Sequence, residues 1–102
     1  MVVYTFSDAW FLLATHYAQG NKKLAQLDAI IDAGDYINHA KFTDDEISGA
    51  VSRLKDGGFL IDRARGYAIT DRFLSQWAEL DGEKHRAIHK HLDVVKRMLN
   101  IS

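Results

Sequence analysis

A helix with clear signals at both ends, followed at once by a strand-like pattern, constrains the fold of this chain more than any other feature. Thr43-Asp44-Asp45-Glu46 forms a capping box, in which the Thr43 hydroxyl and the Glu46 carboxylate each accept a hydrogen bond from the other residue's amide. Four apolar residues follow at helical spacing: Ile47, Ala50, Val51 and Leu54. Gly57-Gly58 then ends the pattern, because glycine readily adopts a positive φ. These signals predict a helix over residues 43–57.

Two short apolar runs around a turn follow this helix. The runs are residues 59–61 and 67–69, and the turn between them is Asp62-Arg63-Ala64-Arg65-Gly66. Such a pattern predicts a β-hairpin. Thr70 then predicts the cap of a further helix, whose apolar face carries Phe73, Leu74 and Trp77.

Two helices are expected before the capping box. Ser7 is expected to cap a helix over residues 8–19, which Gly20 ends. Asn21 is expected to cap a second helix over about residues 22–39. Gly34 lies on the apolar stripe of this second helix, where it either allows close packing of a neighbour or marks a bend. A stripe of aspartates lines the opposite side: Asp28, Asp32 and Asp35.

A last helix is expected over about residues 83–100. Its apolar seam consists of Ile88, Leu92, Val95 and Leu99, which recur at steps of four and three. The seam either closes the core of a monomer or pairs with its copy in a second chain. We expect the second arrangement, a homodimer through the C-terminal helix.

Composition excludes several classes of protein. The chain has 102 residues, 47% of them hydrophobic, which is enough for one folded domain and too apolar for a disordered chain. It has no cysteine, which excludes disulfide scaffolds, thiolate zinc sites and cysteine nucleophiles. No apolar run is long enough to cross a membrane, and the first residues lack the pattern of a secretory signal. We therefore expect a cytoplasmic protein without a membrane partner.

Charge is distributed unevenly along the chain. The net charge is −1, which gives no overall basic surplus. Residues 1–50 contain three Lys or Arg and seven Asp or Glu, whereas residues 51–102 contain ten and seven. The C-terminal half is therefore expected to present a positive face that the total conceals.

The junction between the third helix and the hairpin resembles that of winged helix-turn-helix proteins. Residues 51–60, Val-Ser-Arg-Leu-Lys-Asp-Gly-Gly-Phe-Leu, are similar to the recognition-helix-to-wing junction of bacterial regulators, including the multiple-antibiotic-resistance class. Tyr67-Ala68-Ile69-Thr70 resembles their second wing strand. The resemblance spans residues 43–74 most clearly. It implies a mostly α fold with a small β-hairpin, in which residues 1–82 form the winged domain and residues 83–102 add a C-terminal helix.

The same resemblance implies a DNA-binding transcriptional regulator. In that family the third helix enters the major groove and the hairpin tip contacts an adjacent groove or the backbone. The expected nucleic-acid contacts are Ser48, Ser52, Arg53 and Lys55 on the helix, with Arg63 and Arg65 on the wing.

An acidic helix start opposes major-groove binding. Asp44 and Asp45 would face phosphates, and each would repel them. The alternative is a winged-helix module for protein–protein interaction, which would dock through this acidic start or through the aspartate stripe of the second helix.

No catalytic or metal-binding pattern is convincing. His85 and His89 are four residues apart on one helix face, but His91 falls on another face and no third ligand is evident. The chain has no glycine-rich phosphate loop, nucleophile elbow or paired acid/base signature. We therefore expect a protein without a metal, a cofactor or an enzymatic activity.

Overall fold

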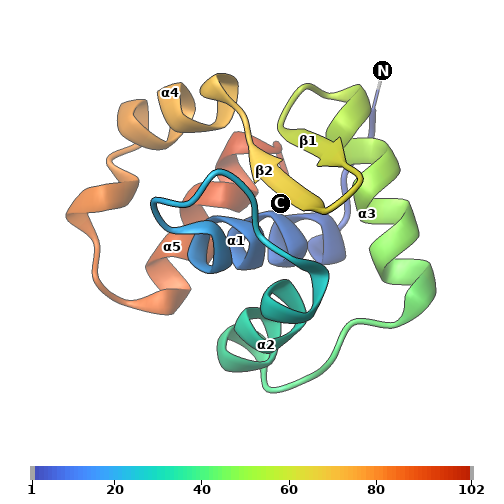
Figure 1. Ribbon diagram of the computed structural model, residues 1–102. Coiled ribbons are helices and arrows are strands. Elements are labelled where there is room, and N and C mark those ends of the chain that lie inside the picture. Colours follow the sequence, from blue (N-terminus) through green and yellow to red (C-terminus); the bar gives the residue numbers. More distant parts are fainter. Residues whose placement is uncertain (1, 102) are drawn as a thin grey trace.

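The computed structural model describes residues 2–101, and these form a mostly helical α+β fold with an antiparallel hairpin (Figure 1). The predicted fold class is therefore confirmed. The elements in chain order are α1 Phe6–Gln19, α2 Leu27–Asn38, α3 Asp44–Asp56, β1 Leu60–Arg63, β2 Gly66–Ile69, α4 Asp71–Glu79, the short 3-10 helix η1 Gly82–Lys84, and α5 Ile88–Met98.

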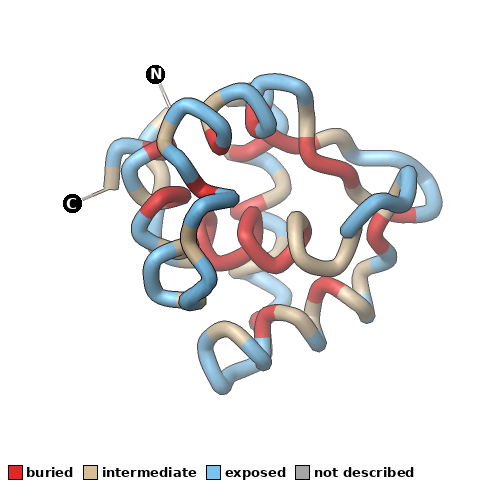
Figure 2. Tube along the Cα trace, turned by 90° about the vertical axis from the view of Figure 1, so that its left-hand side faces the viewer, coloured by how far each residue is buried: buried red, intermediate tan, exposed pale blue. Residues whose placement is uncertain are grey.

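Helix α1 is the centre of the molecule. Its residues 8–15 are all buried, and α2, α3, β2 and α5 pack around it (Figure 2). Trp10, Phe11 and Leu13 belong to one hydrophobic cluster that also contains residues of every other helix and of the hairpin. Residues 2–82 and the C-terminal segment therefore share a single core.

The start of α1 differs from the prediction. Thr5, not Ser7, caps the helix, in a capping box whose other member is Asp8. Ser7 instead donates a hydrogen bond to Glu46 on α3, with 2.7 Å between Ser7 Oγ and Glu46 Oε2. Ser7 lies in the first turn of α1, where its hydroxyl is free to bond across to a neighbouring helix, and the linear sequence could not reveal that neighbour.

The start of α2 was predicted about five residues too early. Helix α2 begins at Leu27, and the preceding segment pairs with the hairpin through an isolated β-bridge between Ala25 and Tyr67. Ala25 exchanges two backbone hydrogen bonds with Tyr67, of 2.7 and 2.9 Å, so its amide and carbonyl are not available for a helix.

Of the two roles considered for Gly34, close packing is observed, because the Phe42 ring occupies the space where a Cβ would lie.

Helix α3 and the hairpin form as predicted. The capping box of Thr43 and Glu46 is present, with N–O distances of 3.1 and 2.9 Å. The hairpin pairs Leu60 with Ile69 and Arg63 with Gly66, so its turn is shorter than expected and consists of Ala64 and Arg65 alone. Thr70 caps α4, as expected.

The last helix is shorter than predicted. The segment expected as helix over residues 83–100 contains η1, a break, and then α5 from Ile88. Val95 and Leu99 of the predicted seam are buried in the hydrophobic core of their own chain. The last helix therefore packs against α1 of its own chain. Among the described residues, no helix combines the length and the apolar character that a membrane crossing requires.

Candidate nucleic-acid interface

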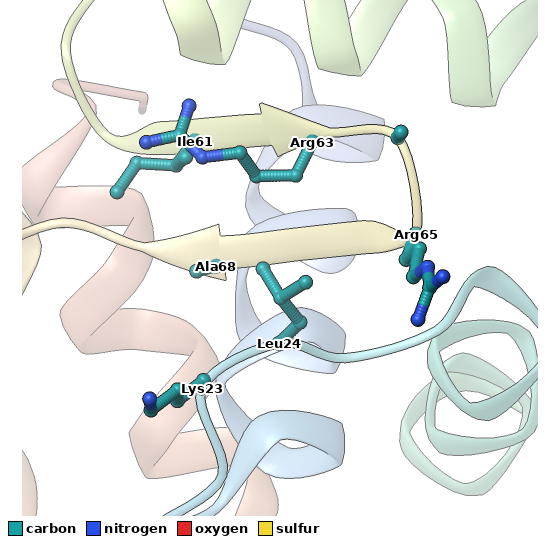
Figure 3. A pocket seen from close by; sticks show the side chains of 7 residues that line it. Lys23, Leu24, Ile61, Arg63, Arg65 and Ala68 are labelled. Carbon is teal, nitrogen blue, oxygen red and sulfur yellow. The ribbon is translucent and has the colours of Figure 1, made fainter.

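The arginines at the hairpin tip line a groove on the outer face of the hairpin, which we call the hairpin groove (Figure 3). Its volume is about 540 Å³. The lining residues are Lys23, Leu24, Ile61, Arg63, Ala64, Arg65 and Ala68. The strand register explains this set, because Ile61 lies opposite Ala68 and the Ala25–Tyr67 pairing brings Leu24 alongside Ala68.

Three cations surround this groove. Figure 3 shows the Arg63 side chain lying along β1 towards Ile61, whereas Arg65 points towards the side of α2 and Lys23 lies on the opposite wall. Within residues 2–101, the ion pairs are those of Arg53, Lys55 and Lys84, so no carboxylate neutralises the three cations of the groove. They are therefore available to an anionic ligand.

The segment that carries Lys23 is tied to the hairpin at two points. The first is the backbone pairing of Ala25 with Tyr67. The second is the Gln19 side chain, whose Oε1 accepts from the Ile69 amide at 2.9 Å while its Nε2 donates to the Lys22 carbonyl at 3.1 Å. These contacts hold Lys23 in register with the hairpin.

Three of the α3 residues expected to contact DNA lie on a second groove, between α3 and β2. It has a volume of about 390 Å³ and is lined by Ile47, Ser48, Val51, Ser52, Lys55, Asp56 and Tyr67. Lys55 lies 3.5 Å from Asp62 of β1, an exposed and loose ion pair. Ser48 and Ser52 are exposed and uncharged. Asp44 and Asp45, in the first turn of the same helix, are exposed and negatively charged. The outward face of α3 is thus polar but not positive.

Arg53 does not join either groove. Its guanidinium binds the Asp8 carboxylate at two points, with Nε–Oδ2 and Nη2–Oδ1 distances of 2.7 and 2.9 Å. Asp8 is fully buried, and the hydrogen bond to it raises the pKa of Arg53. The sequence placed Arg53 on the DNA-facing surface, but the structure gives it a role in joining α3 to α1.

Sequence reasoning found Arg63 and Arg65 but missed Lys23. The missing signal was the non-helical conformation of residues 22–25, which bend and then pair with the hairpin at Ala25. Nothing in the local sequence distinguishes the two conformations, since the pairing of Ala25 depends on a strand that lies more than 40 residues later.

The histidines form no metal site in the described part of the chain. His91 instead makes hydrogen bonds to the Tyr17 hydroxyl at 2.5 Å and to the His85 carbonyl at 2.7 Å, and it contacts the Trp77 ring. Because a carbonyl only accepts, His91 Nε2 carries a proton and Nδ1 is free to accept from Tyr17. The bond to Tyr17 ties α5 to α1, and the bond to His85 ties α5 to the segment that precedes it.

Comparisons with protein-family models, curated proteins and solved structures find no match to this chain.

Proposed function

We propose that this chain is a winged helix-turn-helix protein that binds duplex DNA through its wing and acts as a small transcriptional regulator in the cytoplasm. The order of elements supports the family assignment, because α1, a β-bridge at Ala25, α2, α3 and a hairpin follow one another. The proposed role is binding, not catalysis. The wing consists of the hairpin and the segment around Ala25.

The observation that carries the proposal is the group of three cations on the wing. Lys23, Arg63 and Arg65 come from two separate segments and have no acidic partner within residues 2–101. Each phosphate that such a side chain neutralises releases condensed counterions, which provides most of the free energy of non-specific DNA binding. The exposed Lys22 beside them extends the same charge.

Helix α3 has a lesser part in this proposal than the family resemblance implied. Its first turn carries Asp44, Asp45 and Glu46, and Arg53 is held by Asp8. Ser48, Ser52 and Lys55 remain as proposed contacts, and hydroxyl groups and one cation are suited to phosphate positioning. We therefore propose backbone binding led by the wing.

A titration of fluorescently labelled duplex at low salt tests the proposal. The expected result is binding that weakens steeply as salt is added, with a double variant Arg63→Ala/Arg65→Ala losing about two units of the log–log salt slope. A matched double variant, Arg86→Ala/Arg97→Ala, removes two exposed arginines from the C-terminal segment and should leave the slope nearly unchanged. Absence of duplex binding by the folded protein at low salt would refute the proposal.

The second candidate function is protein–protein interaction, and the acidic surface favours it. Asp28, Asp32 and Asp35 are exposed on α2, and Asp44 and Asp45 are exposed at the start of α3. A basic partner would bind this surface independently of the wing. A partner that is captured by both the parent and the Arg63→Ala/Arg65→Ala protein, and lost when the three α2 aspartates become asparagine, would support this function.

The proposed binding unit is one chain. The homodimer expected from the last helix requires an apolar surface, but Val94, Val95, Met98 and Leu99 are buried in their own chain. His89, Lys90, Asp93 and Arg97 remain exposed on α5, and they are polar. Ile88 and Leu92, the other two residues of the predicted seam, are half-buried, so the part of the seam that one chain leaves accessible is small.

A further inference from the structure

The floor of the hairpin groove is apolar, which phosphate binding does not explain. Leu24, Ile61 and Ala68 lie side by side across the outer face of the hairpin. A phosphate group is strongly hydrated and gains nothing from such a surface. Every side chain that lines the groove is either apolar or cationic, so its chemistry suits a ligand that is both apolar and anionic.

We propose that the hairpin groove binds an acidic peptide segment that carries one large apolar side chain between its carboxylates. The apolar side chain would lie on the floor, and the carboxylates would pair with the cations at the rim. The proposal goes beyond duplex binding, because it uses the floor as well as the cations.

The small side chain of Ala68 is what makes room for the peptide's apolar group. Ala68 lies between two larger residues, Leu24 on the neighbouring segment and Ile61 on β1. Ala68 itself is buried (6% exposed), and the groove of about 540 Å³ that it helps to line has space for a leucine or phenylalanine side chain. Removing that side chain from water provides the favourable free energy.

The placement of the cations favours a peptide over a compact ligand. Arg63 lies along β1, Arg65 points towards α2, and Lys23 is on the opposite wall (Figure 3). Anions that meet all three must be spread across the groove, as carboxylates along an extended chain are. A guanidinium group also binds a carboxylate through two parallel hydrogen bonds.

One consequence is competition between the peptide and the duplex. Both would use Arg63 and Arg65, so occupancy of the groove by the peptide would release DNA. The groove would then be the point at which an acidic protein regulates DNA binding.

A fluorescein-labelled peptide with a central phenylalanine flanked by glutamates provides the test, read out by anisotropy with the complete chain. Replacing the phenylalanine by serine, or the glutamates by glutamine, should weaken binding about tenfold or more. In the protein, Ala68→Leu fills the groove without changing its charge and should weaken peptide binding about tenfold while duplex affinity stays unchanged. Ala78→Leu, on the exposed face of α4, is the matched control.

The outcomes separate this proposal from that of duplex binding. Failure of the peptide to bind the folded protein, or equal binding of the phenylalanine and serine peptides, overturns the peptide site whatever the duplex does. Peptide binding that Ala68→Leu weakens, in a protein that does not bind duplex, supports the peptide site and refutes the proposed DNA function. If Ala68→Leu does not fold by circular dichroism, Ile61→Thr removes apolar floor from a half-buried strand position and serves the same purpose.

Discussion

A single buried carboxylate determines what Arg53 does. Asp8 has no exposed surface, and its oxygens accept hydrogen bonds from the Thr5 amide and from two nitrogens of Arg53. A carboxylate that is removed from water requires both hydrogen bonds and a cation. Arg53 meets that requirement with Nε and Nη2, so the contact that the structure shows for this arginine is with Asp8.

Replacing Arg53 by alanine should lower stability without weakening duplex binding. The variant leaves the buried Asp8 charge without its cation, and because about a third of the Arg53 side chain is exposed (35%) we expect a cost of about 2 kcal/mol in the free energy of unfolding. Urea unfolding measures this cost. The duplex titration, run under conditions in which the variant is folded, should give the parent affinity.

Lys55→Ala is the matched control for stability alone, because Lys55 is itself a proposed DNA contact. The ion pair of Lys55 with Asp62 is exposed, so its loss should cost no more than about 0.5 kcal/mol. An Arg53→Ala protein with unchanged stability and weaker duplex binding would show that the arginine reaches DNA after all.

The exposure of Arg63 and Arg65 could be predicted from the sequence, whereas the contact of Arg53 with Asp8 and the position of Lys23 could not. Arg63 ends β1 and Arg65 lies in the short turn that follows, and both side chains are exposed. Arg53 also occupies an outward position on its helix, but its partner Asp8 lies 45 residues away. Local patterns give the direction of a side chain and not the buried charge that it meets.

At the scale of elements, two capping boxes join α1 to α3. Asp8 belongs to the box of α1 and binds Arg53 of α3, while Glu46 belongs to the box of α3 and accepts from Ser7 of α1. The bonds from Thr43 and Ser7 lower the pKa of Glu46. Each acid therefore caps the start of one helix and positions the other helix.

Replacing Gly66 by alanine should detach the segment around Ala25 from the hairpin. A Cβ at Gly66 would lie 3.0 Å from the Ala25 carbonyl carbon and would overlap the carbonyl oxygen. Both are backbone atoms, so the strand pairing must open, at a cost of about 1–3 kcal/mol.

The same change should weaken duplex binding, because Lys23 would leave the hairpin groove. Urea unfolding and the duplex titration measure the two effects. Gln19→Ala, which removes the other tie between this segment and β2, should weaken binding in the same direction. Parent affinity in both variants would exclude Lys23 from the contact.

The packing of α4 and α5 on α1 should weaken in mild acid because of His16. This histidine lies against Phe73 and Trp77 of α4, with ring centroids 5.0 and 4.9 Å away, and its Nδ1 is buried without a partner in the described chain. Burial, together with the neighbouring His91 of α5, lowers the pKa of His16. An unfolded histidine titrates near 6.5, so below that pH the unfolded chain binds a proton that the folded chain resists.

The free energy of unfolding should therefore be highest above about pH 7 and fall as the pH drops through 6.5. Urea unfolding at pH 7.5 and at pH 5.5 measures the difference. His16→Phe keeps an aromatic ring against Phe73 and Trp77 and should remove most of this pH dependence. His89→Gln, at an exposed position on α5, should leave the pH dependence unchanged. Equal pH dependence in the His16→Phe protein would assign the effect to other groups.

The start residues of α3 and α4 could be predicted from their caps, and the β-bridge segment before α2 could not be predicted. Thr43 and Thr70 signal where α3 and α4 begin, because a hydroxyl that accepts from the first turn is a local feature. No side chain caps α2, whose start is set by the pairing of Ala25 with Tyr67. A long-range backbone pairing leaves no local signal.

At the scale of the whole molecule, the same apolar seam fitted two architectures. The sequence established that Leu92, Val95 and Leu99 share a face, but a helix that closes a monomer core and a helix that pairs with a second chain have the same periodicity. What decides between them is the surface of α1 that remains after α2 and α3 have packed on it. In this protein α5 covers that surface.

The chain should therefore be a monomer, and its last helix should contribute to stability within one molecule. Leu99 is buried in the core cluster, so Leu99→Ala should cost about 2–4 kcal/mol in urea unfolding. If the seam were an interface, unfolding would depend on protein concentration, because dissociation would accompany it. Sedimentation of the parent over a wide range of concentrations should give the mass of one chain. The unfolding midpoint of the parent should not change with protein concentration, and neither should the lower midpoint of Leu99→Ala. A dimer mass, or a midpoint that rises with concentration, would mean that α5 leaves its place on α1 to pair with a second copy.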